Sequence, residues 1–134
     1  MGLGSLPEDR IAVTVLASVI GIYDDRIIVD AGGLALSKDT SAQRHNRAAG
    51  YGLVQNIIGE TLIGVAVTSA NQEHGIIRKT PGSAFPDVRL GDRLRILPNH
   101  VCMTAAAHPG YYVVDGGLHV AARWPRINGW SAWA

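Results

Sequence analysis

The 134-residue sequence has few charged residues, few aromatic residues and a single cysteine. Cys102 cannot form a disulfide within the chain, which fits a reducing compartment. Charged residues make up 17% of the chain and give a net charge of +1, which argues against a surface that binds nucleic acid. Hydrophobic residues make up 47%, which excludes an intrinsically disordered chain.

The sequence also lacks a hydrophobic run long enough to cross a bilayer. The longest run, from Ile11 to Tyr23, has 13 residues and is interrupted by Thr14. The segment before it, Pro7 to Asp9, is acidic, whereas a signal peptide would begin with a basic segment. These absences predict a cytoplasmic protein with neither a membrane nor a nucleic-acid partner.

Motifs of the common nucleotide-binding and hydrolase folds are missing. Neither Ala31-Gly32-Gly33 nor Gly50-Tyr51-Gly52 matches the dinucleotide fingerprint or the phosphate-binding loop, and there is no G-x-S-x-G motif. The two lysines, Lys38 and Lys79, lie among polar or turn residues, where a Schiff-base lysine is not expected. These patterns alone therefore assign no catalytic or cofactor-binding residue.

Short runs rich in β-branched residues, separated by glycine-containing turns, predict an all-β fold with little helix. About eight such strands with tight turns favour a small, closed or nearly closed β-barrel. We expect residues 1–10 to be a leader and residues 11–134 to form this single domain. The predicted strands are Ile11–Ile22, Arg26–Asp30, Leu53–Ile57, Leu62–Thr68, Gly75–Arg78, Arg93–Leu97, Tyr111–Val114 and Leu118–Ala122.

Two connecting segments stand out between these strands. Asp115-Gly116-Gly117 is the clearest hairpin signal, because Asp-Gly supplies the positive φ that a tight turn needs. The polar stretch from Ser37 to Gly50 contains 14 residues with no clear element. Loops of that length are often functional or mobile, although a solvated loop is an equal alternative. We expect His45 in this stretch, and His108 and His119 elsewhere, to be structural or exposed residues and not metal ligands.

The most informative segment, Leu97 to Thr104, contains His100 and Cys102. If the segment is extended, residues two apart point to the same face, so an imidazole and a thiolate could share a zinc ion. Two ligands alone hold a metal weakly. Because H-x-C is a weak motif, the spacing by itself favours a buried cysteine beside a hydrogen-bonded histidine.

A second polar cluster, Gln72 to Gly75, places Glu73 beside His74. The two side chains could form an acid–base pair, or the carboxylate could orient a ligating imidazole. Neighbouring residues of a strand point to opposite faces, so a shared site requires a bend, which Gly75 permits. A polar turn is the favoured alternative.

Six short motifs stand in a characteristic order along the chain. They are Val29–Gly32, Ala35–Asp39, Gly50–Gly52, Gln72–Gly75, Val88–Cys102 and Arg123–Pro125. In this order they resemble the C-terminal domain of the D-serine dehydratase and D-threonine aldolase-like family. The resemblance covers about residues 11–130, and Pro98-Asn99-His100-Val101-Cys102 is its most specific part.

The resemblance implies an enzyme of alanine-racemase type, with an N-terminal (β/α)8 barrel that carries pyridoxal phosphate on a lysine and a C-terminal β-barrel domain. It implies that His100 and Cys102 hold zinc or manganese, which polarises the hydroxyl group of a D-3-hydroxy amino acid. A thiolate ligand favours zinc. Such subunits usually pair head to tail, so a homo-oligomer is expected.

The chain departs from the family pattern in ways that affect activity. It is too short for a (β/α)8 domain, which needs about 200 residues or more. The cofactor lysine is therefore expected in a missing or separate barrel, and this chain alone is expected to lack lyase activity. Leu34 also stands where the family often has a basic residue.

Two other interpretations remain. The chain could be a non-catalytic β-barrel module for dimerisation or partner docking, with Trp124, Trp130 and Trp133 packed in the core or at an interface. It could also be a freestanding metal-binding protein in which His74 or His108 completes the ligand set.

Overall fold

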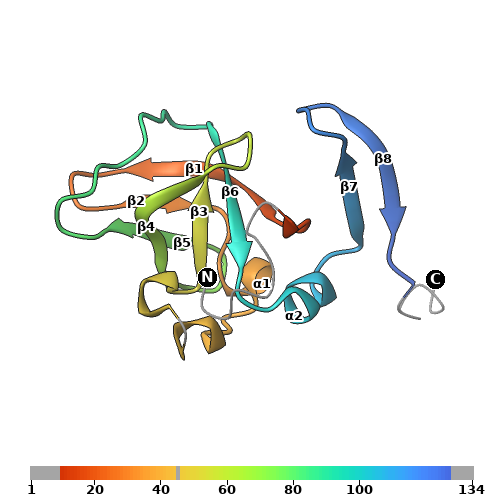
Figure 1. Ribbon diagram of the computed structural model, residues 1–134, viewed down its shortest axis with the longest axis horizontal. Helices are drawn as coiled ribbons and strands as arrows, with labels where there is room; N and C mark the ends of the chain where they lie inside the picture. Colours follow the sequence, from red (N-terminus) through yellow and green to blue (C-terminus); the bar gives the residue numbers. More distant parts are fainter. Residues whose placement is uncertain (1–9, 45, 128–134) are drawn as a thin grey trace.

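The computed structural model describes residues 10–44 and 46–127, and its main body is a closed barrel of six antiparallel strands (Figure 1). Around the barrel the strands follow the order β1-β2-β5-β4-β3-β6. The all-β fold with little helix predicted from the sequence is thereby confirmed. The predicted leader lies outside the described residues except for Arg10.

The barrel strands are β1 (Val15–Ile22), β2 (Ile27–Val29), β3 (Gly52–Gln55), β4 (Thr61–Ala70), β5 (Gly75–Lys79) and β6 (Arg93–Pro98). The remaining elements are α1 (Gly33–Leu36), η2 (Ser41–Arg44), η3 (Arg47–Ala49), α2 (Val101–Ala106), β7 (Gly110–Val114) and β8 (Val120–Pro125). Every predicted strand overlaps an observed one, although the bounds differ by a few residues.

Alternating side chains explain why these segments form a barrel. In β1, Val15, Ala17 and Val19 are buried, whereas Leu16 and Ile20 are more than half exposed. Because successive side chains of a strand point to opposite faces, one apolar face fills the interior and drives closure. The other residues of this core include Ile27, Val29, Val54, Val67, Ile77, Leu94 and Ile96.

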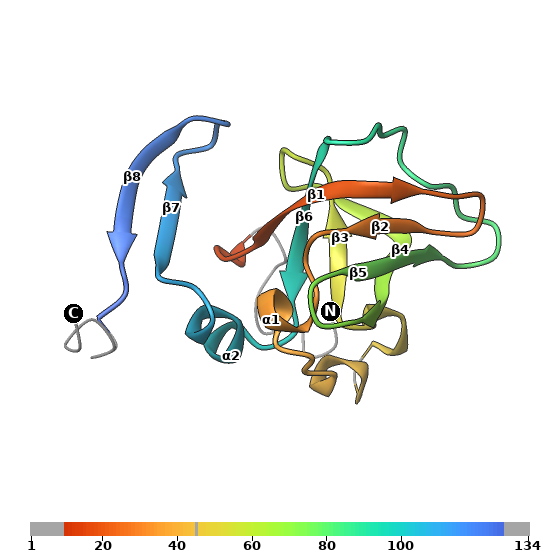
Figure 2. The same ribbon diagram turned by 180° about the vertical axis from the view of Figure 1, so that it is seen from behind.

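One end of the barrel carries α1, α2, η2 and η3 (Figures 1 and 2). Helix α1 follows β2 and α2 follows β6, and a hydrogen bond from Thr104 Oγ1 to the Leu36 carbonyl joins them at 3.3 Å. The prediction that residues 37–50 hold no element was wrong, because η2 and η3 lie there. The Asn46 side chain caps η3 by accepting from the Ala48 backbone N–H.

The predicted hairpin is present as β7 and β8, a sheet separate from the barrel. Gly116 at its turn has φ +67°, the left-handed conformation expected there. Strand β8 begins at Val120, two residues later than predicted, and Trp124 on it is 61% exposed. Trp130 and Trp133 lie outside the described residues. Within the described ranges, no helix has the length and apolar character to span a membrane.

Candidate functional site

The Pro-Asn-His-x-Cys stretch leads from the end of β6 into α2. Pro98 is the last residue of β6, and His100 directly precedes the helix with extended backbone angles of φ −141° and ψ 92°. The segment is therefore not extended beyond His100, and the same-face condition does not hold, because Cys102 lies in the first helical turn. The hydrogen bond from the Thr104 N–H to the His100 carbonyl, at 3.0 Å, closes that turn.

The His100 imidazole is held by a carboxylate from a distant part of the chain. Its Nδ1 lies 3.1 Å from Asp39 Oδ2, and the two side chains are 40% and 18% exposed, respectively. A neutral imidazole that donates from Nδ1 to a carboxylate keeps the lone pair on Nε2. In this arrangement Nε2 is the ring atom available to a ligand.

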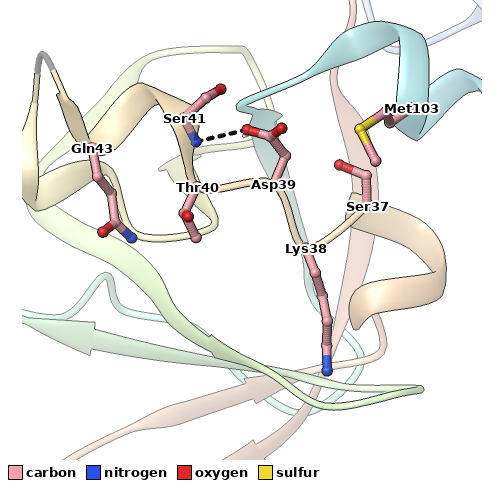
Figure 3. Close-up of a pocket in the computed structure, with 7 residues that line it drawn as sticks. All are labelled: Ser37, Lys38, Asp39, Thr40, Ser41, Gln43 and Met103. Atoms are coloured by element: carbon pink, nitrogen blue, oxygen red, sulfur yellow. Dashed lines mark hydrogen bonds between the residues drawn. The ribbon is translucent and has the colours of Figure 1, made fainter.

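Asp39 is ionised at neutral pH. Hydrogen bonds from the Ser41 side chain and backbone, together with a smaller one from His100, lower its pKa to about 2. The Ser41 backbone N–H donates to Asp39 Oδ1 at 2.7 Å (Figure 3). Sequence reasoning did not single out Asp39, although Asp-x-Ser is typical of a turn in which the carboxylate accepts from the N–H two residues later.

Asn99 ties the loop that carries Asp39 to the end of β6. Its Nδ2 donates to the Asp39 carbonyl and to the Gly50 carbonyl, each at 2.8 Å. Gly50 has φ +54°, and a Cβ there would lie 2.2 Å from the Val67 carbonyl oxygen, so only glycine fits. Sequence reasoning also missed this role of Asn99.

The start of the same loop has an unusual backbone. Ser37 and Lys38 have φ of +77° and +54°, the left-handed conformation that non-glycine residues seldom adopt. Such conformations persist where the surrounding contacts hold them. The loop therefore reaches Asp39 through a constrained turn.

An open hollow of about 740 Å³ lies beside Asp39 (Figure 3). Met103, from α2, borders it on one side, and the loop after α1 borders it on the other. The hollow leaves this side of the site accessible to small molecules. Its lining residues are Ser37, Lys38, Asp39, Thr40, Ser41, Gln43 and Met103.

Cys102 is an exposed free thiol, so the alternative of a buried cysteine is wrong. In the part of the chain that the structure describes, no three histidine, cysteine, aspartate or glutamate side chains gather closely enough to hold a metal ion. His100 and Cys102 are thus two possible donors at the start of one helix.

The Gln72–Gly75 cluster is a polar turn between β4 and β5, as the favoured alternative predicted. His74 Nε2 lies 3.0 Å from Asn71 Nδ2, while Glu73 accepts from Gln72. The turn instead supports α1, because the Asn71 carbonyl accepts from the Gly33 N–H at 2.6 Å.

His108 and His119 do not join His100. His108 Nε2 lies 3.2 Å from the Ala35 carbonyl, where it links the end of α2 to α1. His119 is exposed in the β7–β8 connection, and His45 lies outside the described residues. The interpretation in which His74 or His108 completes a closed metal site therefore has no support among the described residues.

Comparison with known proteins identifies the family. The protein-family model described as "Putative serine dehydratase domain" matches residues 12–114. The chain belongs to this family. It is 41% identical over 136 residues to the D-threo-3-hydroxyaspartate dehydratase of Delftia sp., with 96% of this chain and 35% of that protein covered. It is 34% identical over 120 residues to the D-serine dehydratase of Dictyostelium discoideum, with 84% of this chain and 29% of that protein covered.

Solved structures confirm that the fold is the C-terminal barrel of such enzymes. A histidine-to-alanine mutant of D-threo-3-hydroxyaspartate dehydratase superimposes with a TM-score of 0.85 at 39% identity, covering 96% of this chain and 34% of that one. A cysteine-to-alanine mutant of that enzyme in a metal-free form superimposes with a TM-score of 0.82 at 39% identity. The match covers 96% of this chain and 35% of that one. Its replaced histidine and cysteine are two residues apart. This serine dehydratase-family chain spans about a third of the length of these relatives.

Proposed function

We propose that this chain is the metal-binding C-terminal domain of a pyridoxal-phosphate-dependent lyase that acts on D-3-hydroxy amino acids, and that it lacks lyase activity by itself. The observation that carries the proposal is the arrangement of His100 and Cys102 at the start of α2, with Asp39 on Nδ1 of the histidine. A histidine and a cysteine with the same spacing were the targets of mutation in the dehydratase relative.

The chemistry of the donor set fits zinc, with manganese as the alternative. Imidazole nitrogen and thiolate sulfur are the donors that zinc prefers, and Cys102 is exposed to receive a metal. A carboxylate on the second ring nitrogen, as Asp39 is on His100, is the usual support of a ligating histidine. The other positions would be left to water, to the substrate and to groups from elsewhere.

In this proposal each residue has a definite task. His100 Nε2 and Cys102 Sγ bind the metal, and Asp39 fixes the orientation of the imidazole. Asn99 holds the loop on which Asp39 lies. When bound, the metal supplies Lewis-acid polarisation of the substrate's hydroxyl group.

Pyridoxal phosphate would come from another domain or chain, where it supplies the electron sink for the reaction. Neither lysine of this chain suits the cofactor, because a lysine that would hold it needs a desolvated site. Lys38 is exposed, and Lys79 is exposed with its ammonium 5.2 Å from the Phe85 ring centre. We therefore infer a (β/α)8 partner that carries the cofactor and a small D-amino acid as substrate.

The cellular setting follows from the same residues. An exposed free thiol that binds metal must stay reduced, so we infer a cytoplasmic location.

The names of the relatives support the substrate class, since serine and 3-hydroxyaspartate both carry a hydroxyl group on C3.

Titration of the purified 134-residue chain with cobalt(II) tests the proposal, since cobalt replaces zinc and reports thiolate ligation by a charge-transfer band. We expect the band in the unmodified chain, its loss in Cys102→Ala and its weakening in His100→Ala. His119→Ala removes an exposed histidine elsewhere and should leave the band unchanged. A band of equal intensity in Cys102→Ala would refute the assignment of the ligands.

The exposed hairpin favours a second candidate, a docking module that forms a homo-oligomer or binds the cofactor domain. Tyr112, Val120 and Trp124 are 70%, 51% and 61% exposed, which is unusual for large apolar side chains on one small sheet. Sedimentation of the chain tests the homo-oligomer. A Trp124→Lys variant should shift an oligomer towards the monomer. An unmodified chain that sediments as a monomer would contradict self-association.

A further inference from the structure

Arg95 lies on the outer face of the barrel but is more shielded than its neighbour Arg93. In β6, Leu94 and Ile96 are buried in the interior, so both arginines point outward. Arg93 is exposed, whereas Arg95 is half-buried. The difference arises because residues 11–14, the β3–β4 turn and the tip of the β7–β8 hairpin gather around Arg95.

These segments line a cavity of about 320 Å³. Pockets for small molecules begin at roughly this volume. Its polar lining includes Thr14, Arg95 and Gln55. Gln55 is buried, with an exposed fraction of 5%. Its apolar lining includes Ile58 and Leu118, which are 67% and 58% exposed. A ligand with a hydrocarbon part would remove this apolar surface from water.

The guanidinium of Arg95 is oriented by uncharged groups. Its Nε donates to the Ile57 carbonyl at 2.8 Å, and its Nη1 donates to Thr14 Oγ1 at 3.2 Å. Both acceptors are uncharged. Across residues 10–44 and 46–127, no carboxylate lies within ion-pairing distance of Arg95 and Nη2 makes no hydrogen bond. A fixed guanidinium with free donors matches a carboxylate in geometry and charge.

We propose that this cavity binds a small aliphatic monocarboxylate. A carboxylate oxygen accepts from Arg95 Nη2, and the hydrocarbon part lies against Ile58 and Leu118. A single cationic side chain in so small a cavity suits a monoanion better than a phosphate ester, which attracts several cationic groups and backbone N–H donors.

An NMR titration of the 15N-labelled chain with isovalerate tests this site, at constant pH and ionic strength. We expect saturable shifts of the Gly59, Gly116 and Gly117 amides, which line the cavity, with a Kd of about 1 mM or weaker for so small an acid. Isovaleramide has the same shape without the charge and should cause no such shifts. Equal shifts with the acid and the amide would overturn the proposal.

Two variants and one control distinguish isovalerate binding in this cavity from nonspecific attraction of anions to the protein. Arg95→Gln should weaken isovalerate binding by about tenfold or more, because a charge-assisted hydrogen bond is lost. Arg93→Gln removes the same charge two residues away and should retain the affinity. Leu118→Asp should also weaken binding by roughly tenfold, by repulsion at an exposed position that does not support the fold. If Arg95→Gln fails to fold, unchanged binding by Leu118→Asp refutes the site.

Discussion

The barrel interior and the loop end, which is the end of the barrel that carries Asp39 and His100, are held together by different forces. Inside the barrel, apolar side chains such as Ile77 and Ile96 are fully buried. Antiparallel pairing between neighbouring strands hydrogen-bonds the backbone, with register shifts in three of the six pairings. At the loop end, individual side-chain hydrogen bonds position the chain. Asn99 donates to the carbonyls of Asp39 and Gly50, and the Asp39 carboxylate accepts from the Ser41 N–H and interacts with His100. Stability and site geometry therefore depend mainly on different residues, with Asn99 and Gly50 connecting the two regions. Each can therefore be changed with a limited effect on the other.

The largest effect on stability should come from the barrel interior. Ile96→Ala removes a fully buried side chain and should lower the free energy of unfolding by about 3–4 kcal/mol. Urea denaturation measures this loss. Ile63→Ala, at a position that is 89% exposed on β4, is the matched control and should change stability by about 0.5 kcal/mol or less. Equal losses in the two variants would contradict the assigned interior.

Gly50→Ala should produce the next largest loss, because it joins the two regions. The added Cβ would meet the Val67 carbonyl of β4, and alanine resists a φ of +54°. We expect a loss of about 1–3 kcal/mol in thermal or urea unfolding. Gly59→Ala, which also has positive φ but no atom within 4 Å of a Cβ, should lose less. The ranking fails if Gly59→Ala is the more damaging change.

Asn99→Ala should affect both regions moderately. Its side-chain amide donates two hydrogen bonds to backbone carbonyls, so we expect a loss of about 1–2 kcal/mol in stability. Because the Asp39 loop is released from β6, cobalt affinity should fall as well. Asn71→Ala removes an exposed asparagine from the β4–β5 turn and should leave cobalt affinity unchanged. Unaltered cobalt binding by Asn99→Ala would show that the loop holds its place without this residue.

Asp39→Asn should separate the two regions most sharply. Asparagine can still accept from the Ser41 N–H, so the midpoint of urea unfolding should change little. The imidazole loses its anionic partner, so metal affinity should fall by about 10- to 100-fold. Cobalt titration and urea denaturation of the same sample measure both. The separate roles would be disproved if stability fell sharply while affinity held.

The smallest effect should come from the hairpin. Trp124 is 61% exposed on β8, outside the barrel, so Trp124→Ala should change the stability of the monomer by about 0.5 kcal/mol or less. The measurement is thermal unfolding at a concentration where the chain is monomeric. A larger loss would mean that the hairpin supports the barrel more than its exposure indicates.

Local patterns carried the fold prediction because strand signals are short-range. Alternation in β1 and β6 and the Asp-Gly turn between β7 and β8 depend only on neighbouring residues. The helix at Val101–Ala106 escaped prediction because it has only six residues, too few for a helical period to emerge. It is stabilised by contacts such as that between Thr104 and Leu36, which are far apart in the sequence.

The all-β class, the hairpin and the choice of His100 and Cys102 as candidate donors could be read from the amino-acid sequence alone. The folded chain was needed to show that Asp39 contacts His100, 61 positions away in the sequence, and that Asn99 reaches the carbonyls of Asp39 and Gly50. Likewise, the barrel's closure and the packing around Arg95 decided which arginine of β6 is shielded. The physical reason is that periodicity and turn chemistry are local, whereas a polar contact between distant segments exists only after the apolar core has brought them together.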